Sequence, residues 1–152
     1  MNISNKKFNR EFTSLDKYEV GISLTGSEVK SIRLGRARLE GAYVKFDSMG
    51  RLMLVGCDIS LYSFAHDKLQ YDPKRTRYLL MHKKELVKLH SKLSRGGANN
   101  TIIPTKFYFK GNIIKLEISL ASGKKTWEVG KMEKNEDTKR NVAKEMKDYL
   151  KK

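Results

Sequence analysis

The side chains best suited to hold a ligand stand together near the middle of the chain. Three cations, Lys74, Arg75 and Arg77, precede a short apolar run at residues 78–81, and His82-Lys83-Lys84 follows that run. Because the cations flank a run that can be buried, the fold itself should hold positive charge at a fixed place. Each phosphate that such a surface neutralises releases condensed counterions. The pattern therefore predicts binding of a polyanion, with Lys74, Arg75 and Arg77 among the contacts.

Residue patterns for enzymatic chemistry are weak. The histidines are His66, His82 and His90, and the last two stand eight residues apart, too far for the adjacent-turn pair of a helical metal site. Neither a Gly-rich phosphate loop nor a G-x-S-x-G serine elbow occurs. Cys57, the only cysteine, lies in an apolar run, which favours a buried structural thiol over a nucleophile. We expect a protein that is not an enzyme and uses no metal or cofactor.

Aromatic residues beside cations offer another contact with nucleic acid, because bases stack on exposed rings. Phe107, Tyr108 and Phe109 are consecutive between two lysines. Strand alternation places Phe107 and Phe109 on one face, which we expect to be the core, and leaves Tyr108 as the exposed candidate. Trp127 follows Lys124-Lys125 in a polar setting, where it either docks on the body or meets a partner.

Charge and length limit the class of protein. The chain has 152 residues and a formal net charge of +15, so we expect one domain, about two-thirds of its unfolded surface buried, and an anionic partner. On composition alone, the alternative to an anionic partner is a basic protein that is merely soluble. The single cysteine excludes an intramolecular disulfide and suits a reducing compartment. No signal-peptide core or membrane-length apolar window occurs. We expect a cytoplasmic monomer that binds no membrane.

Short strands dominate the elements that must position these residues. Alternating or apolar-rich segments predict strands at residues 16–24, 43–46, 52–59, 101–110 and 112–120. Alternation in the last of these points Lys115 away from the core. Thr25 and Glu28 form a capping box that begins a short helix, and Gly35 ends it. A leucine pattern predicts a second helix over residues 83–95. Together they favour a small OB-like antiparallel barrel, mainly β, with accessory helices.

The two ends of the chain are polar and basic. Residues 1–12 predict a loosely held arm. Residues 1–130 hold 24 Lys and Arg against 12 Asp and Glu, so the predicted RNA-binding domain carries most of the excess charge. Residues 131–152 hold eight Lys and Arg against five Asp and Glu, with scattered apolar residues. We interpret this segment as a flexible tail that becomes helical on a partner.

Four separated blocks resemble the small protein B family, the SsrA-binding (tmRNA-binding) proteins of bacteria. They are residues 5–7, 25–37, 72–85 and 121–125, in matching order and spacing. The resemblance implies an OB-like barrel that binds the tRNA-like domain of tmRNA and brings it to stalled ribosomes in trans-translation. It also implies a tail that enters the empty message channel near the small-subunit decoding region. Such a protein acts by binding, without catalysis.

The same resemblance identifies contact residues. It implies RNA-binding roles for Glu19, Leu80, His82 and Lys115, and the barrel-exit block adds Lys124 and Lys125. Leu80 has an alternative role in the core. Trp127 takes the place of a family aromatic that meets the ribosome, followed by Lys131 and Lys134. The tail departs from the family pattern, because Glu128-Val129-Gly130 replaces a charged triplet.

A second hypothesis does not depend on the resemblance. A general single-strand nucleic-acid-binding OB module would use Tyr108 and neighbouring aromatic residues as a stacking platform. It would bind short oligonucleotides with little preference for sequence. The RNA that accompanies the purified protein distinguishes the two hypotheses: one structured species with a tRNA-like end, or a mixture of short fragments.

Overall fold

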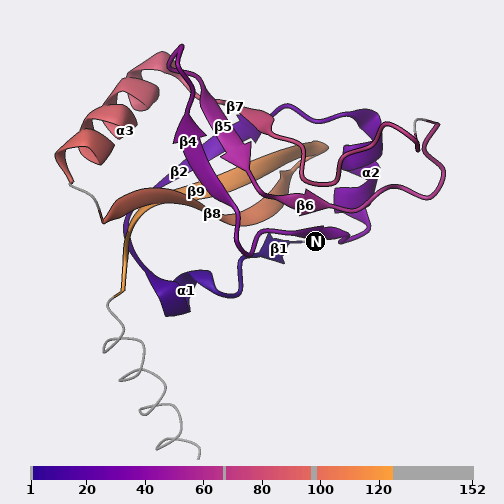
Figure 1. Cartoon of the computed structure of the whole chain (residues 1–152), viewed down its shortest axis with the longest axis horizontal. Helices are drawn as coiled ribbons and strands as arrows, with labels where there is room; N and C mark the ends of the chain where they lie inside the picture. The colour runs from indigo at the N-terminus through magenta and orange to yellow at the C-terminus, as the bar shows by residue number, and fades with distance from the viewer. Residues whose placement is uncertain (1, 67, 97–98, 125–152) are drawn as a thin grey trace, which may run out of the picture.

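Six antiparallel strands close into a barrel in the part of the chain that the computed structural model describes, residues 2–66, 68–96 and 99–124 (Figure 1). Around the barrel they are β2 (Phe12–Ile22), β7 (Arg77–Leu80), β5 (Leu52–Val55), β4 (Tyr43–Phe46), β8 (Asn100–Lys110) and β9 (Ile113–Gly123). β9 pairs with β2 on one side and β8 on the other, which closes the ring. The predicted mainly β barrel with accessory helices is confirmed.

Alternate side chains of the long strands fill the barrel. In β9 the apolar side chains that alternate along the strand are buried: Ile114, Leu116, Ile118 and Leu120. Lys115 lies between them and is partly exposed, as alternation predicts. In β2, Val20 is buried while Glu19 is exposed. β2 begins at Phe12, earlier than the predicted strand at 16–24, because its first residues pair with the end of β9.

Both predicted helices lie outside the barrel. α2 (Gly26–Arg33) begins where the Glu28 amide donates a hydrogen bond to Thr25 Oγ1 at 3.3 Å, so the predicted cap is confirmed. The chain leaves α2 through Gly35, whose φ of 74° is a left-handed conformation suited to glycine. α3 (Lys83–Arg95) has the predicted bounds and buries Leu89 against the barrel.

The N-terminal segment is held to the barrel, so the expectation of a loosely held arm over residues 1–12 is wrong. β1 (Ile3–Ser4) pairs with β8, beyond the point where β4 pairs with the same strand. Asn5 Nδ2 donates a hydrogen bond to a carbonyl of β8 at 3.0 Å. α1 (Phe8–Glu11) then buries Phe8 in a small apolar cluster. One buried aromatic ring and two strand pairs outweigh the polar composition of the segment.

A second, two-stranded sheet lies beside the barrel. It consists of β3 (Ala37–Arg38) and β6 (Asp58–Ile59). The single strand predicted over residues 52–59 is therefore wrong, because the chain turns at Gly56 with a φ of 76° and leaves the barrel after β5. After this turn the Ile59 amide donates a hydrogen bond to the Pro73 carbonyl at 2.9 Å, so the segment before β7 lies beside β6.

Cys57 lies in this turn with an exposed fraction of 0%, which confirms that the thiol is buried. Burial raises the pKa of the Cys57 thiol to about 12. Because the thiolate is the reactive form, we expect a disulfide reagent such as DTNB to modify Cys57 at pH 8 only as fast as the protein unfolds. Stopped-flow absorbance would measure the rate, with full labelling in denaturant as the control. Rapid labelling of the folded protein would contradict this arrangement.

Residues 125–152 lie outside the described residues, and with them the predicted tail and the domain boundary at residue 130. Lys125, Trp127, Lys131 and Lys134 belong to this segment, so their proposed contacts stay predictions. Across the described ranges, none of the helices has the length and apolar character to span a bilayer.

Candidate nucleic-acid interface

Four residues that the family resemblance singled out lie around one hollow. Glu19, Leu80, His82 and Lys115 line a hollow of about 500 Å³ together with Gly21, Met81 and Glu85. They come from β2, β7, the start of α3 and β9, segments far apart in the sequence that the barrel closure makes neighbours. The structure thus gathers a carboxylate, an imidazole, an ammonium and an apolar side chain on one surface.

Gly21 forms the centre of this surface, because it pairs with Leu80 on one side and with Lys115 on the other. A Cβ atom at this position would lie 3.3 Å from Leu80 Cβ. That distance is tighter than ordinary van der Waals contact, so glycine allows the three strands to approach here. It also leaves the hollow open between Leu80 and Lys115.

Leu80 is a surface residue, which settles the alternative that it belongs to the core. Its exposed fraction is 64%, whereas Leu79 beside it is buried. An exposed leucine next to a lysine can contact the apolar face of a base while the cation meets a phosphate. His82 is also exposed, and although it is the N-cap of α3 its side chain makes no capping hydrogen bond. Both side chains are accessible to a ligand.

Glu19 is the negative charge of the hollow. Its Oε1 accepts a hydrogen bond from Lys110 Nζ at 3.4 Å, which makes the two residues an ion pair. The nearby Tyr108 hydroxyl is the main cause that lowers the pKa of Glu19, and the two lysines, Lys110 and Lys115, lower it further. Glu19 is therefore ionised at neutral pH and acts only as a hydrogen-bond acceptor.

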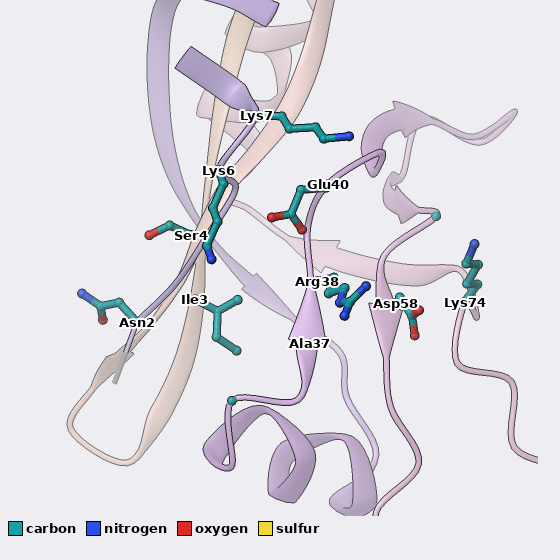
Figure 2. A pocket seen from close by; sticks show the side chains of 12 residues that line it. Asn2, Ile3, Ser4, Lys6, Lys7, Ala37, Arg38, Glu40, Asp58 and Lys74 are labelled. Atoms are coloured by element: carbon teal, nitrogen blue, oxygen red, sulfur yellow. The ribbon is translucent and has the colours of Figure 1, made fainter. Parts of the chain in front are cut away.

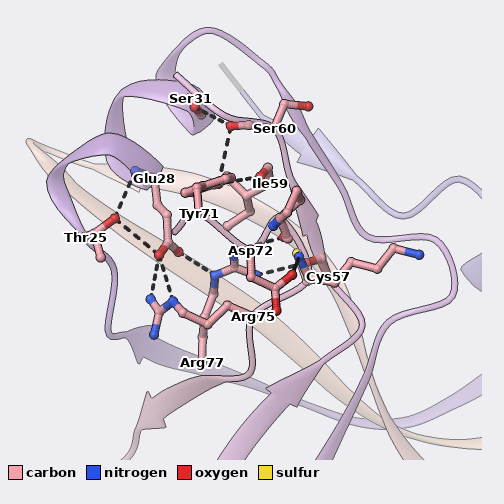
Figure 3. Close-up of polar contacts among 12 residues, drawn as sticks. Thr25, Glu28, Ser31, Cys57, Ile59, Ser60, Tyr71, Asp72, Arg75 and Arg77 are labelled. Atoms are coloured by element: carbon pink, nitrogen blue, oxygen red, sulfur yellow. Dashed lines mark hydrogen bonds and ion pairs between the residues drawn. The ribbon is translucent and has the colours of Figure 1, made fainter. Parts of the chain in front are cut away.

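Arg77 is not part of any RNA-binding surface, and its assignment to the predicted set is wrong. Its exposed fraction is 0%, and its guanidinium forms an ion pair with Glu28. Arg77 also donates to the Cys57 carbonyl at 2.8 Å and to the Pro73 carbonyl at 3.1 Å. Figure 3 shows this network between α2 and the segment before β7. Arg77 therefore pins three chain segments together inside the protein.

Arg75 binds the other oxygen of the same carboxylate. Its Nη2 lies 2.6 Å from Glu28 Oε1, and Nε lies 3.1 Å from the same atom. The Arg75 side chain is 42% exposed, so one edge of the guanidinium faces solvent. Arg75 can still approach a phosphate, but Glu28 neutralises part of its charge.

Alternation explains why Arg77 lies inside. Leu79 was expected in the buried run, and in a strand Arg77 shares its face. The signal that sequence reasoning missed is Glu28, which it used only as a helix cap. A carboxylate on the buried side of α2 needs a cationic partner, and Arg77 is that partner, 49 residues along the chain.

Lys74 lies at a different hollow. This second hollow of about 880 Å³ is lined by Lys74, Lys6, Lys7 and Arg38, with Glu40 and Asp58 among them. Figure 2 shows the four cations on three separate segments, the N-terminal strand region, β3 and the segment before β7. The two hollows share no lining residue. Lys74 and Lys115, both predicted RNA contacts, therefore lie at different hollows.

The remaining predicted positions lie elsewhere. Lys124 follows β9 beside α1, where its ammonium donates to the Asn9 carbonyl at 2.5 Å. Phe107 is buried, and Phe109 packs against the core, as predicted. Tyr108 faces outward but is half-buried, and Lys106 Nζ lies 5.6 Å from the centre of its ring.

Comparison with known proteins shows which families, proteins and solved structures this chain resembles. The family model described as SmpB protein matches residues 2–148. An SsrA-binding protein of Carboxydothermus hydrogenoformans is 41% identical over 96% of this chain and 93% of its own length. One from Chlorobaculum tepidum is 43% identical over 97% of this chain and 92% of its own length. A chain in the solved structure described as "tmRNA-SmpB: a journey to the center of the bacterial ribosome" gives a TM-score of 0.67 at 35% identity, over 82% of this chain and 85% of that one.

Proposed function

The chain belongs to the SmpB protein family, and from this we propose that it binds tmRNA and delivers it to stalled ribosomes for trans-translation and ribosome rescue. The observation that carries the proposal is the hollow in which Glu19, Leu80, His82 and Lys115 meet. These residue types offer phosphate, base and hydrogen-bond donor contacts on one rigid surface. The protein acts as a cytoplasmic binding protein without a catalytic step of its own.

The two hollows suit a large, folded RNA better than a single strand. The distribution of cations over separate surfaces favours a ligand with phosphates in several directions. The competing hypothesis, a general single-strand-binding module, needs an exposed aromatic platform. Its candidate, Tyr108, is half-buried and Lys106 Nζ lies 5.6 Å from the centre of its ring, which leaves little ring face for a base.

The RNA that remains with the protein after purification tests this function. We expect sequencing to recover one structured species with a tRNA-like end, and binding assays to show that it outcompetes an unstructured RNA of equal length. A mixture of short fragments, bound as tightly as the structured RNA, would support the single-strand module instead.

Charge reversal at Lys115 should weaken tmRNA binding without unfolding the barrel. Lys115 is partly exposed at the edge of the hollow, so Lys115→Glu removes one favourable contact and adds a repulsive one. We expect roughly 5- to 150-fold weaker binding, or about 1–3 kcal/mol, and a change in stability within about 0.5 kcal/mol. Filter binding and thermal melting measure the two effects.

Lys45→Glu is the matched control for this substitution. Lys45 is exposed on β4, on the opposite side of the ring from β2 and β9. The two variants have the same net charge, so only a local contact makes Lys115→Glu the weaker binder. Equal losses in both variants would show that overall charge, not the hollow, controls affinity.

A further inference from the structure

Two aromatic rings lie together on the surface of the loop that follows β6. The ring centres of Tyr62 and Phe64 are 5.7 Å apart, in the edge-to-face arrangement that aromatic pairs favour. Phe64 has an exposed fraction of 79%, and Tyr62 is half-buried. Neither ring belongs to the buried clusters that the described residues form. The pair therefore contributes little to the core and offers an apolar surface to a partner.

Hydrogen bonds fix the turn that carries the rings. The Ser60 amide donates to the Arg36 carbonyl at 3.0 Å, and the Ser60 carbonyl accepts a hydrogen bond from Ser31 Oγ at 2.7 Å (Figure 3). Beyond Ser60, the Ala65 amide donates to the Tyr62 carbonyl at 3.0 Å. Since the turn is ordered before a ligand arrives, binding at the rings costs less conformational entropy than binding at a loose segment.

Cations of α2 and of the segment after it lie beside the pair. Lys30 Nζ lies 5.2 Å from the centre of the Tyr62 ring, which is a cation–π distance. Arg36 Nη1 donates a hydrogen bond to Ser63 Oγ at 3.4 Å, so its guanidinium lies next to the residue between the two rings. Arg33 is exposed at the end of α2. Exposed rings flanked by cations are the combination that binds unpaired bases and their phosphates.

The aromatic pair adjoins the Lys74 hollow. Asp58 lines this hollow and begins β6, which leads directly into the loop. Gly35 and Ala37 also line it, and they flank Arg36, whose carbonyl and side chain hold the loop. Four cations in the lining outnumber two carboxylates. Rings and cations thus form one surface, with a stacking site beside a phosphate-binding site.

This surface is separate from the hollow proposed for tmRNA. The two hollows share no lining residue. Figure 1 shows α2 and the loop at one end of the barrel and α3 at the other, and α3 begins beside the hollow of Glu19 and Lys115. Delivery of tmRNA to a ribosome requires contact with two RNA bodies at once. A protein that binds one of them through the first hollow therefore needs a second RNA surface.

We propose that Tyr62 and Phe64 stack against an unpaired base of ribosomal RNA while the cations of the Lys74 hollow bind the neighbouring phosphates. The inference rests on the proposed delivery to ribosomes and adds the surface that meets the second RNA. Two rings hold about one or two bases, fewer than the run of bases that a general single-strand module binds. The phosphate contacts make the interaction sensitive to salt, whereas stacking on the rings does not depend on charge.

Phe64→Ala tests the stacking site. We expect the complex of this variant with tmRNA to bind stalled ribosomes about 5- to 50-fold more weakly than the wild-type complex. Its tmRNA affinity and melting temperature should not change, because Phe64 is exposed and does not line the first hollow. Phe64→Trp should bind as wild type, since a ring face is kept. Leu69→Ala, at a fully exposed apolar side chain of the same loop, is the matched control and should also bind as wild type. Fluorescence anisotropy of labelled protein measures both affinities.

Ultraviolet crosslinking of the wild-type complex on the ribosome identifies the partner directly. Mass spectrometry should find a nucleotide of ribosomal RNA attached to the peptide that contains Tyr62 and Phe64. A crosslink to tmRNA, or weaker tmRNA binding by Phe64→Ala, would assign the rings to tmRNA and overturn the inference. Equal losses of ribosome affinity in Phe64→Ala and Leu69→Ala would overturn it too, because they would indicate a general apolar contact with a ribosomal protein.

The inference also fails if Phe64→Ala binds ribosomes as wild type. Failure of the proposed function looks different, since wild-type protein would then not prefer tmRNA to an unstructured RNA of equal length.

Discussion

Replacing Glu28 by alanine should destabilise the protein by about 3–5 kcal/mol, because it leaves the fully buried Arg77 without its counter-charge. The cost exceeds that of an ordinary helix cap, which is about 1 kcal/mol. Glu28 also holds Arg75, so the segment before β7 loses its ion pair with α2 as well. Urea unfolding followed by circular dichroism would measure the difference.

Controls separate the buried charge from other effects. Glu85→Ala removes an exposed glutamate from the first turn of α3 and should change stability by about 0.5 kcal/mol or less. The double variant Glu28→Ala/Arg77→Met should be more stable than Glu28→Ala alone, since no unpaired charge stays buried. If Glu28→Ala lost less than about 1 kcal/mol, water rather than Glu28 would be satisfying Arg77.

The stabilisation that Glu28 provides should decrease as the pH falls. Burial alone would raise the pKa of Glu28, but hydrogen bonds from Arg75 and Arg77 outweigh it and hold the pKa below its usual 4.5. A carboxyl group with a lowered folded-state pKa stabilises the fold above its unfolded pKa, and this contribution is lost as the pH falls. The stability difference between wild type and Glu28→Ala should therefore narrow below about pH 4.5.

A chain that ends at Gly130 should keep its affinity for tmRNA within about tenfold, or roughly 1.4 kcal/mol, and should lose ribosome rescue altogether. The body retains most of the charge, with 24 Lys and Arg against 12 Asp and Glu in residues 1–130. The resemblance to the family implies that the removed segment, which includes Lys131 and Lys134, enters the message channel. Filter binding and an in vitro tagging assay on stalled ribosomes measure the two functions.

Lys115→Glu is the natural counterpart to this truncation, since it should weaken RNA binding in a chain with an intact tail. Removal of Lys151 and Lys152 alone controls for the loss of terminal charge. A large loss of affinity on truncation at Gly130 would mean that the tail also binds tmRNA, and the division between residues 1–130 and 131–152 would be wrong.

Local patterns predicted the elements that depend on local physics. Alternation found β9 and oriented Lys115, and leucine spacing gave the bounds of α3. Features that depend on distant partners were missed. Arg77 lies inside because Glu28, 49 residues earlier, turns toward it. The N-terminal arm is ordered because Phe8 finds an apolar cluster that includes Ile103 and Ala121.

In the candidate site, too, the sequence identified residues but not the contacts between distant parts of the chain. The family resemblance supplied Glu19, Leu80, His82 and Lys115, but no sequence pattern shows that strands β2, β7 and β9 are neighbours. Tyr108 was considered from sequence as a stacking ring. Its half-buried position opposite Lys115 depends on the register between β8 and β9, which no single residue pattern shows.

Barrel closure also has a consequence for how the chain folds during its own synthesis. Both partners of β2 come later in the chain, and Ser14 Oγ lies 2.8 Å from Ser119 Oγ although 105 residues separate them. At about 5–20 residues per second, translation needs roughly 5–20 s to produce β9 after β2. Until then β2 lacks its longest pairing, the one with β9, and the charges of Asp16, Lys17 and Glu19 help to keep that edge from aggregating. A copy released before β9 is complete cannot close the barrel and is left as a substrate for proteases.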